Sequence, residues 1–155
     1  MGLRENILSH PVSQLELRPL IVVEPATTVR QAIEQMRQKR VGCVVVVKGD
    51  RLLGKFTERE LIGLLLKCAG ALEEAVGDHM AAAWHGVSRG DPIASVIECM
   101  EAKKLRFVIV LDDEGRPVGL TGQKGVMEYI AEHFPRQVKV QETESKLYMD
   151  EREGA

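Results

Sequence analysis

The chain has 155 residues, a length that suits one compact domain or two very small units that share a core. Apolar residues make up 45% of the sequence and charged residues 28%, which is ordinary for a globular protein in water. The net charge is −2, lysine and arginine are spread along the chain, and only 4% of residues are aromatic. This composition argues against a nucleic-acid-binding surface, which needs clustered cations and, for single strands, stacking platforms.

The sequence also bears on targeting and on the redox state of the cysteines. The most apolar run, residues 61–66, is too short to cross a bilayer, and no signal peptide is visible. The cysteines, Cys43, Cys68 and Cys99, are odd in number, widely spaced and set among apolar residues. We interpret them as reduced packing residues of a cytoplasmic protein. The histidines show no ligand spacing with them, so no metal site is predicted.

The first half of the chain is predicted to alternate helices and strands. Apolar residues at helical spacing predict a helix from 29 to about 40, and the uniformly apolar run that follows predicts a strand covered on both faces. A turn signal at 48–50 joins that strand to a hairpin partner. In chain order, the predicted elements are a helix at 3–9, a strand at 20–23, a helix at 29–40, strands at 41–47 and 51–56, and a helix at 58–68.

The second half repeats the first. A shift of 64 places residues 93–111 on 29–47 with six identities in nineteen positions, and one extra residue in the second hairpin turn places Gly119 on Gly54. A unit of about sixty residues buries too little surface to be stable alone. We therefore expect two repeats that pack against each other around a shared core.

Residues 54–60 carry the candidate binding chemistry, because Thr57 and Glu60 lie three residues apart at the predicted start of a helix. A hydroxyl at a helix start, followed three residues later by Glu, is typical of a capping box. The same groups could instead receive a ligand, with Thr57 and the helix-start N–H groups holding a phosphate and Glu60 accepting sugar hydroxyls. The residues alone leave both interpretations open.

The doubled pattern resembles a pair of cystathionine-β-synthase (CBS) domains, together called a Bateman module. The matching features are the lead-in residues Val12 and Val76, the Asp-His-Met motif at 78–80, the helix at 29–36, the strands around Val44 and Val108, and the hairpin strands at 52–57 and 117–121. The resemblance implies an α+β fold of two β-α-β-β-α repeats packed with pseudo-twofold symmetry. The expected organisation is a lead-in at 1–11, CBS domains at 12–70 and 71–135, and a charged, flexible tail at 136–155, in which 138–140 could add a short strand.

The resemblance implies a regulatory sensor without enzymatic activity, which binds AMP, ADP, ATP or S-adenosylmethionine between the repeats. The family's signature places a Thr or Ser hydroxyl on phosphate and, three residues later, an Asp on the ribose diol. Here these positions hold Thr57 and Glu60, and Glu sets the carboxylate about one methylene further out. The second copy has Gly122 and Gly125 at the same positions, so that cleft lacks a polar side chain there to bind a ribose. Lys124 could neutralise a phosphate there or simply be exposed.

Each cleft in the family also borrows residues from the other repeat. For the Thr57 cleft, the resemblance brings in His85, Val87, Arg106 and Phe107. The planar guanidinium of Arg106 suits phosphate oxygens, although it could equally pair with an acidic neighbour. His85 could stack on a purine or simply pack beside its strand.

The sequence also bears on catalysis and assembly. It contains no nucleophile elbow, no phosphate-binding Gly-x-x-x-x-Gly-Lys loop and no paired Cys/His arrangement, so no enzyme is predicted. The apolar helix at 61–66 and its counterpart at 126–130 exceed what one small core needs. In Bateman modules such helices pair two copies, so we expect a homodimer. The competing interpretation is a dimeric scaffold that binds no nucleotide, and the regulated partner cannot be named from the sequence.

Overall fold

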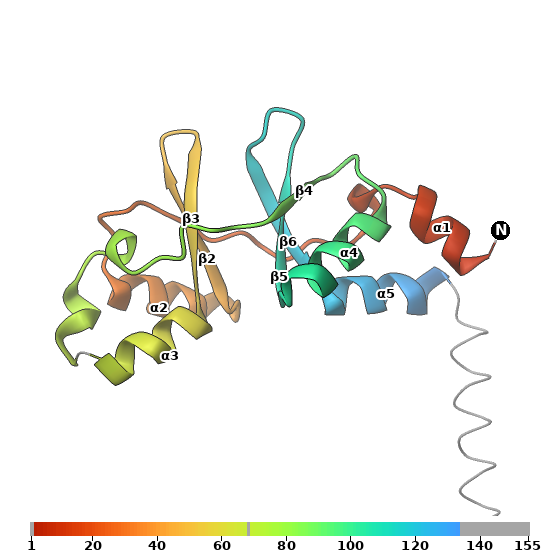
Figure 1. Ribbon diagram of the computed structural model, residues 1–155. Helices are drawn as coiled ribbons and strands as arrows, with labels where there is room; N and C mark the ends of the chain where they lie inside the picture. The colour runs from red at the N-terminus through yellow and green to blue at the C-terminus, as the bar shows by residue number, and fades with distance from the viewer. Residues whose placement is uncertain (1, 68, 134–155) are drawn as a thin grey trace, which may run out of the picture.

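The computed structural model describes residues 2–67 and 69–133 (Figure 1). Its helices and strands are α1 (Leu3–Ser9), β1 (Val22–Val23), α2 (Val29–Lys39), β2 (Cys43–Lys48), β3 (Arg51–Thr57), α3 (Glu58–Lys67), β4 (Gly86–Ser88), α4 (Ile93–Lys103), β5 (Phe107–Leu111), β6 (Pro117–Gly122) and α5 (Gln123–His133). The predicted order of elements is confirmed, although β1 and β2 begin two residues later than expected. Cys68 and the predicted tail, with its considered strand at 138–140, lie outside the described residues.

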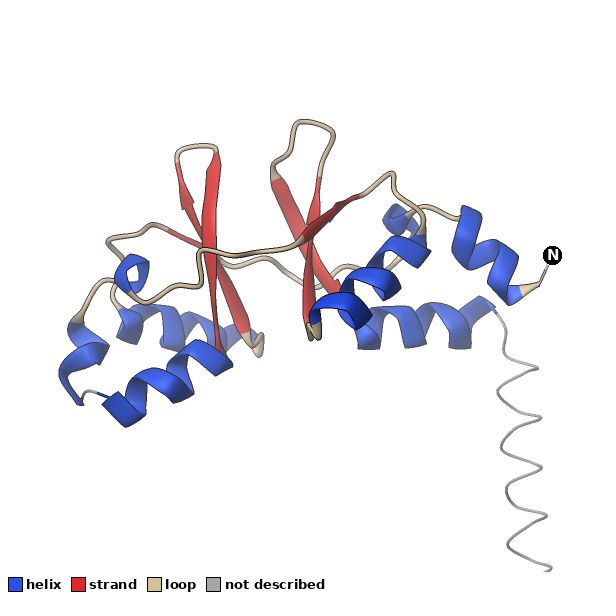
Figure 2. Cartoon of the chain, viewed as in Figure 1, coloured by secondary structure: helices blue, strands red, loops and turns tan. Residues whose placement is uncertain are grey.

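The two repeats form two sheets of identical topology. In each sheet the short first strand pairs parallel with the second, which pairs antiparallel with the third, giving the orders β1-β2-β3 and β4-β5-β6. The antiparallel pairs shift register at equivalent points, between Val46 and Val47 and between Val110 and Leu111. Both hairpins extend to the same side of the molecule, while the helices lie on the opposite side (Figure 2). This arrangement confirms two α+β repeats.

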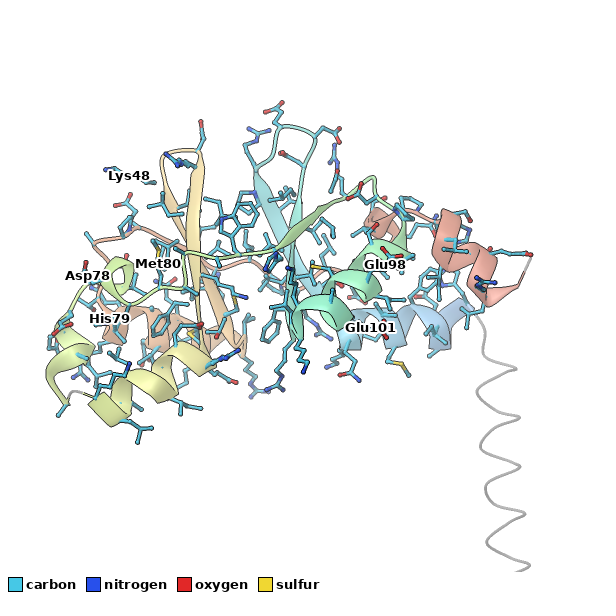
Figure 3. The ribbon with its side chains drawn as sticks, viewed as in Figure 1. Lys48, Asp78, His79, Met80, Glu98 and Glu101 are labelled. Carbon is cyan, nitrogen blue, oxygen red and sulfur yellow. The ribbon has the colours of Figure 1, made fainter. Side chains whose placement is uncertain are left out.

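The lead-in of each repeat packs against the other repeat. Arg18 exchanges two backbone hydrogen bonds with Leu120 of β6, at 2.8 and 3.2 Å. Lys55 of β3 exchanges the equivalent pair with Ala81, at 3.0 and 2.8 Å. The second lead-in is visible beside α2 and α3, where Asp78, His79 and Met80 are labelled (Figure 3). Because of this exchange, each cleft between the repeats is built from both halves of the chain.

Three apolar clusters hold the fold together. One lies between the first sheet and its helices around Phe56, and a second lies in the other repeat around Tyr129. The third joins the two sheets, where the buried residues Cys43 and Val45 of β2 meet Ile109 of β5 and Leu120 of β6. The strand β2, which was predicted to be covered on both faces, is therefore covered by helices on one face and by the other repeat on the opposite face. The shared core expected from the repeat is confirmed.

Among the described residues, no helix combines the length and hydropathy that a bilayer crossing requires. The N-terminal helix α1 packs against α4 at the outer end of the second repeat (Figure 1). His10, which ends α1, forms a hydrogen bond through Nδ1 with the Tyr129 hydroxyl of α5. The ring of Tyr129 stacks in turn on His133, with centroids 4.2 Å apart.

Candidate functional site

The start of α3 has capping geometry. The Oε2 atom of Glu60 accepts a hydrogen bond from the Thr57 backbone N–H at 2.7 Å and another from the Thr57 hydroxyl. The Thr57 oxygen accepts in turn from the backbone N–H of Arg59 at 3.2 Å. The carboxylate thus folds back over the first turn and satisfies donors that the helix leaves unpaired. The capping interpretation describes the structure as it stands.

These residues also line a cleft of about 740 Å³ between the repeats, which we call the first cleft. Its walls come from β3 and α3 of the first repeat and from the lead-in and the start of β5 of the second. The lining residues are Gly42, Lys55, Thr57, Glu58, Arg59, Glu60, Ile62, Ala81, Ala83, His85, Lys104, Leu105, Arg106 and Phe107. This volume lies within the range typical of small-molecule sites.

Five of the six residues named from the sequence meet at this cleft. Thr57, Glu60, His85, Arg106 and Phe107 all belong to its lining. Arg106 is exposed, whereas the His85 and Phe107 rings are partly buried. The sixth residue does not reach the cleft, because the Val87 side chain is buried in the core cluster of the second repeat. Residues two apart in a strand share a face, but His85 precedes β4, which begins at Gly86, so strand alternation does not relate the two side chains.

Three further cations of the first cleft were not predicted from the sequence: Lys55, Arg59 and Lys104. Lys104 directly follows α4 in the left-handed conformation, with φ of 51°. Its counterpart in the first repeat is Arg40, which directly follows α2 with φ of 53°. The shift of 64 that revealed the repeat relates Arg40 to Lys104, so comparing the two helix ends would have drawn attention to Lys104. The cleft therefore carries more positive charge than the sequence pattern suggested.

The pseudo-symmetric second cleft has a volume of about 570 Å³. Its residues are Glu16, Arg18, Arg40, Val41, Gly42, Leu105, Arg106, Phe107, Thr121, Gly122, Gln123, Lys124, Gly125 and Met127. A Cβ on Gly122 would lie 2.3 Å from the Arg106 carbonyl oxygen, and a Cβ on Gly125 would lie 2.7 Å from Thr121 Oγ1. Gly122 thus fits closely against backbone and Gly125 against the Thr121 side chain, and this cleft lacks a hydroxyl and a carboxylate at the positions of Thr57 and Glu60.

The two clefts can therefore do different chemistry. The first combines a carboxylate and a hydroxyl with cations and two rings, which together suit a sugar, a phosphate and a flat base. The second offers cations without a side-chain carboxylate or hydroxyl at the sugar position. In the part of the chain that the structure describes, no group of three or more His, Cys, Asp or Glu side chains is placed to share a metal ion.

Comparisons with known proteins agree with the fold. The sequence profile of the CBS domain matches residues 12–67 and 76–132. A probable arabinose 5-phosphate isomerase of Haemophilus influenzae is 25% identical over 120 residues, which are 77% of this chain and 35% of that protein. The chain thus spans about a third of the length of this curated relative.

Two solved structures have similar folds. A CBS-domain-containing protein from Agrobacterium tumefaciens has a TM-score of 0.64 at 26% identity, covering 72% of this chain and 84% of that one. CBSX2, solved in complex with AMP, has a TM-score of 0.67 at 22% identity, covering 79% of this chain and 96% of that one. With two profile matches, one on each repeat, the chain belongs to the CBS domain family as a tandem CBS pair.

Proposed function

We propose that this chain is a regulatory ligand-sensing module, not an enzyme, that acts in the cytoplasm and binds an adenine nucleotide or adenosyl compound in the first cleft. The observation that carries the proposal is the convergence there of Thr57 and Glu60 of one repeat with Arg106 and Phe107 of the other. Candidate ligands are AMP, ADP, ATP and S-adenosylmethionine. The similar CBSX2 structure contains AMP, which supports this ligand class.

The roles of the residues follow from their chemistry. Glu60 would accept hydrogen bonds from the ribose diol, while Thr57, the α3 N-terminus and Arg106 would hold phosphate oxygens. The partly buried rings of His85 and Phe107 would contact the purine. Both hydrogen bonds from Thr57 end on Oε2 of Glu60, so a diol that takes this atom exchanges one set of hydrogen bonds for another. The net gain from the diol is correspondingly modest.

Sensing would follow from the exchange of lead-ins. A ligand in the first cleft touches both repeats, so it favours the relative arrangement in which its contacts are complete, and a partner protein reads that population shift. The match to the isomerase relative covers only 35% of that protein.

Calorimetric titration with AMP, ADP, ATP and S-adenosylmethionine tests the proposal. We expect at least one to bind. Arg106→Gln and Glu60→Gln should each lower the affinity for that ligand about tenfold, because each removes one charge-assisted contact. Arg89→Gln is the matched control, because Arg89 is also an exposed arginine but lines neither cleft and pairs with Asp113. Absence of binding, or binding that both cleft variants leave unchanged, would refute the site.

A second candidate function is a dimeric interaction scaffold, and the surface of α3 favours it. Ile62, Leu65 and Leu66 are 62%, 54% and 86% exposed and share one face of α3 at i, i+3 and i+4. On α5 only Met127 is comparably exposed, because Val126 and Tyr129 are buried in the core. An exposed apolar face of this kind supports a homodimer through the second helices, with α3 contributing most of the contact.

A further inference from the structure

The second cleft gathers cations from three separate elements. Arg40 follows the end of α2, Arg106 precedes β5, and Lys124 lies in the first turn of α5. Within residues 2–67 and 69–133, none of the three takes part in an ion pair. The fourth cation of the cleft, Arg18, is neutralised by Glu128 at 2.8 Å. Three cations without a carboxylate partner thus face one cavity.

The backbone fixes two of these positions. Arg40 is left-handed, with φ of 53°, and its N–H donates to the carbonyl groups of Met36 and Arg37 at the end of α2. Lys124 is held at the start of an eleven-residue helix, α5. The first backbone N–H groups of such a helix have no partners within it and favour negative charge. The backbone positions of Arg40 and Lys124 are therefore fixed by helix ends.

A buried hydroxyl under the same helix turn is also without a partner. Thr121 is only 3% exposed, and its Oγ1 has no hydrogen-bond partner among the described residues. This atom lies against the first turn of α5, since a Cβ on Gly125 would approach it to 2.7 Å. Thr121 belongs to the lining of the second cleft. A buried donor left unsatisfied is costly unless something outside the chain completes it.

Acidic groups near the cleft are few. Glu16 is the carboxylate in its lining, against the cations Arg18, Arg40, Arg106 and Lys124. At the junction with the first cleft, the Glu58 carboxyl group lies near Gly42, where an added Cβ would be 3.2 Å from its carbon Cδ. The junction is shared, because Gly42, Leu105, Arg106 and Phe107 line both clefts. A chain of phosphates could extend from one cleft to the other past Arg106, with Glu58 opposing it.

We propose that the second cleft binds an oligophosphate group, without a sugar contact, through Arg40, Arg106 and Lys124. Gly125 replaces the carboxylate that would hold a sugar, and Gly122 replaces the hydroxyl beside it, while the cations and the α5 N-terminus suit compact anions. Two sources have this chemistry: a free inorganic oligophosphate, or the phosphate tail of a nucleotide whose adenosine lies in the first cleft. Only the second source rests on the proposed function.

Titrations of the full chain with inorganic tripolyphosphate, AMP and ATP separate these sources. If tripolyphosphate binds alone and loses affinity as salt rises, the free source is supported. If tripolyphosphate does not bind but ATP binds at least tenfold more tightly than AMP, the tail of a nucleotide is the occupant. If tripolyphosphate does not bind and ATP is no tighter than AMP, the proposal is overturned, even where AMP binding upholds the first cleft.

Charge variants locate the contact. Lys124→Gln and Arg40→Gln should each lower the affinity for tripolyphosphate, or the ratio of the ATP affinity to the AMP affinity, by about tenfold. Lys103→Gln is the control, because it deletes an equally exposed helical cation that lines neither cleft. Glu58→Gln should raise the affinity for ATP, because it removes the opposing charge, and should change the affinity for tripolyphosphate less. Equal effects of Lys124→Gln, Arg40→Gln and Lys103→Gln would show diffuse electrostatic attraction only and overturn the assignment.

Discussion

The carboxylate of Glu60 accepts hydrogen bonds from both the backbone N–H and the hydroxyl of Thr57. The two side chains that the CBS pattern assigns to ribose and phosphate therefore satisfy each other. A helix cap of this kind contributes about 1 kcal/mol, so a ligand that breaks it loses about fivefold in affinity. Capping and binding are not exclusive functions of the pair, but they compete for Oε2 of Glu60 and for the Thr57 hydroxyl.

Shortening the carboxylate tests this competition. Glu60→Asp should lower the free energy of unfolding by about 0.5–1 kcal/mol, because Asp reaches the Thr57 N–H less well. The same change should raise nucleotide affinity about two- to fivefold, since less capping energy is lost on binding. Urea denaturation and calorimetry measure the two quantities. Glu98→Asp, on an exposed position of α4 (Figure 3), is the control, and a loss of affinity in Glu60→Asp alone would contradict the competition.

Most of the fold could be predicted from the sequence because the pattern occurs twice. Equivalent apolar positions such as Val44 and Val108 specify one buried strand in each repeat, and the offset between them fixes the element order. Lead-in exchange was implied only by the family resemblance. It depends on long-range backbone pairs, such as Arg18 with Leu120, that leave no local signal in the sequence.

The site was harder to predict than the fold. Spacing identified Thr57 and Glu60, but it could not show that Glu60 turns back onto Thr57, because that choice depends on a side-chain torsion. Nor could it show that Val87 would be buried while Arg106 stays exposed. In the second repeat, Gly122 and Gly125 looked like lost binding groups. The structure adds that both are required by close contacts with Arg106 and Thr121.

Two threonine hydroxyl groups, one without a hydrogen-bond partner and one with a partner, provide opposite tests. Thr121→Val removes an unpartnered buried hydroxyl with little change of shape, so we expect the free energy of unfolding to rise by about 1 kcal/mol. Thr28→Val removes the cap of α2, whose hydroxyl accepts from the Gln31 N–H at 3.1 Å, so the same quantity should fall by about 1 kcal/mol. Urea denaturation without phosphate measures both. Destabilisation by Thr121→Val would show that its hydroxyl has a partner in solution.

Cysteine reactivity reports on the shared core. Burial raises the pKa of the Cys43 thiol to about 12, and its side chain is fully buried between the two sheets. A raised thiol pKa means that the reactive thiolate is scarce below that pH, about one part in 10⁴ at pH 8. We therefore expect iodoacetamide to leave Cys43 unmodified from pH 7 to pH 9, while the partly exposed Cys99 is alkylated.

Peptide mass spectrometry separates the cysteines, and urea provides the control. In urea the core opens, so Cys43 should react as fast as Cys99. Rapid labelling of native Cys43 would mean that the sheets separate readily, against a core shared by both repeats. Cys68, which lies outside the described residues, is followed on its own peptide and has no part in the comparison.

The apolar face of α3 predicts a dimer that one charge should break. Leu65→Glu places a carboxylate in the centre of the face formed with Ile62 and Leu66, where a dimer would bury it without a partner. Burying such a charge costs several kcal/mol, so the dissociation constant of the dimer should rise more than a hundredfold. Sedimentation at micromolar concentration should then show a dimer for the parent chain and a monomer for the variant.

Leu8 supplies the matched control for this dimer. It is 54% exposed, the same as Leu65, but lies on α1 at the outer end of the second repeat, away from α3 (Figure 1). Leu8→Glu should therefore remain a dimer, because it adds the same charge at a position that stays in water. If the parent chain sediments as a monomer, the homodimer is refuted. If both variants dissociate, the contact is not confined to the second helices of the repeats.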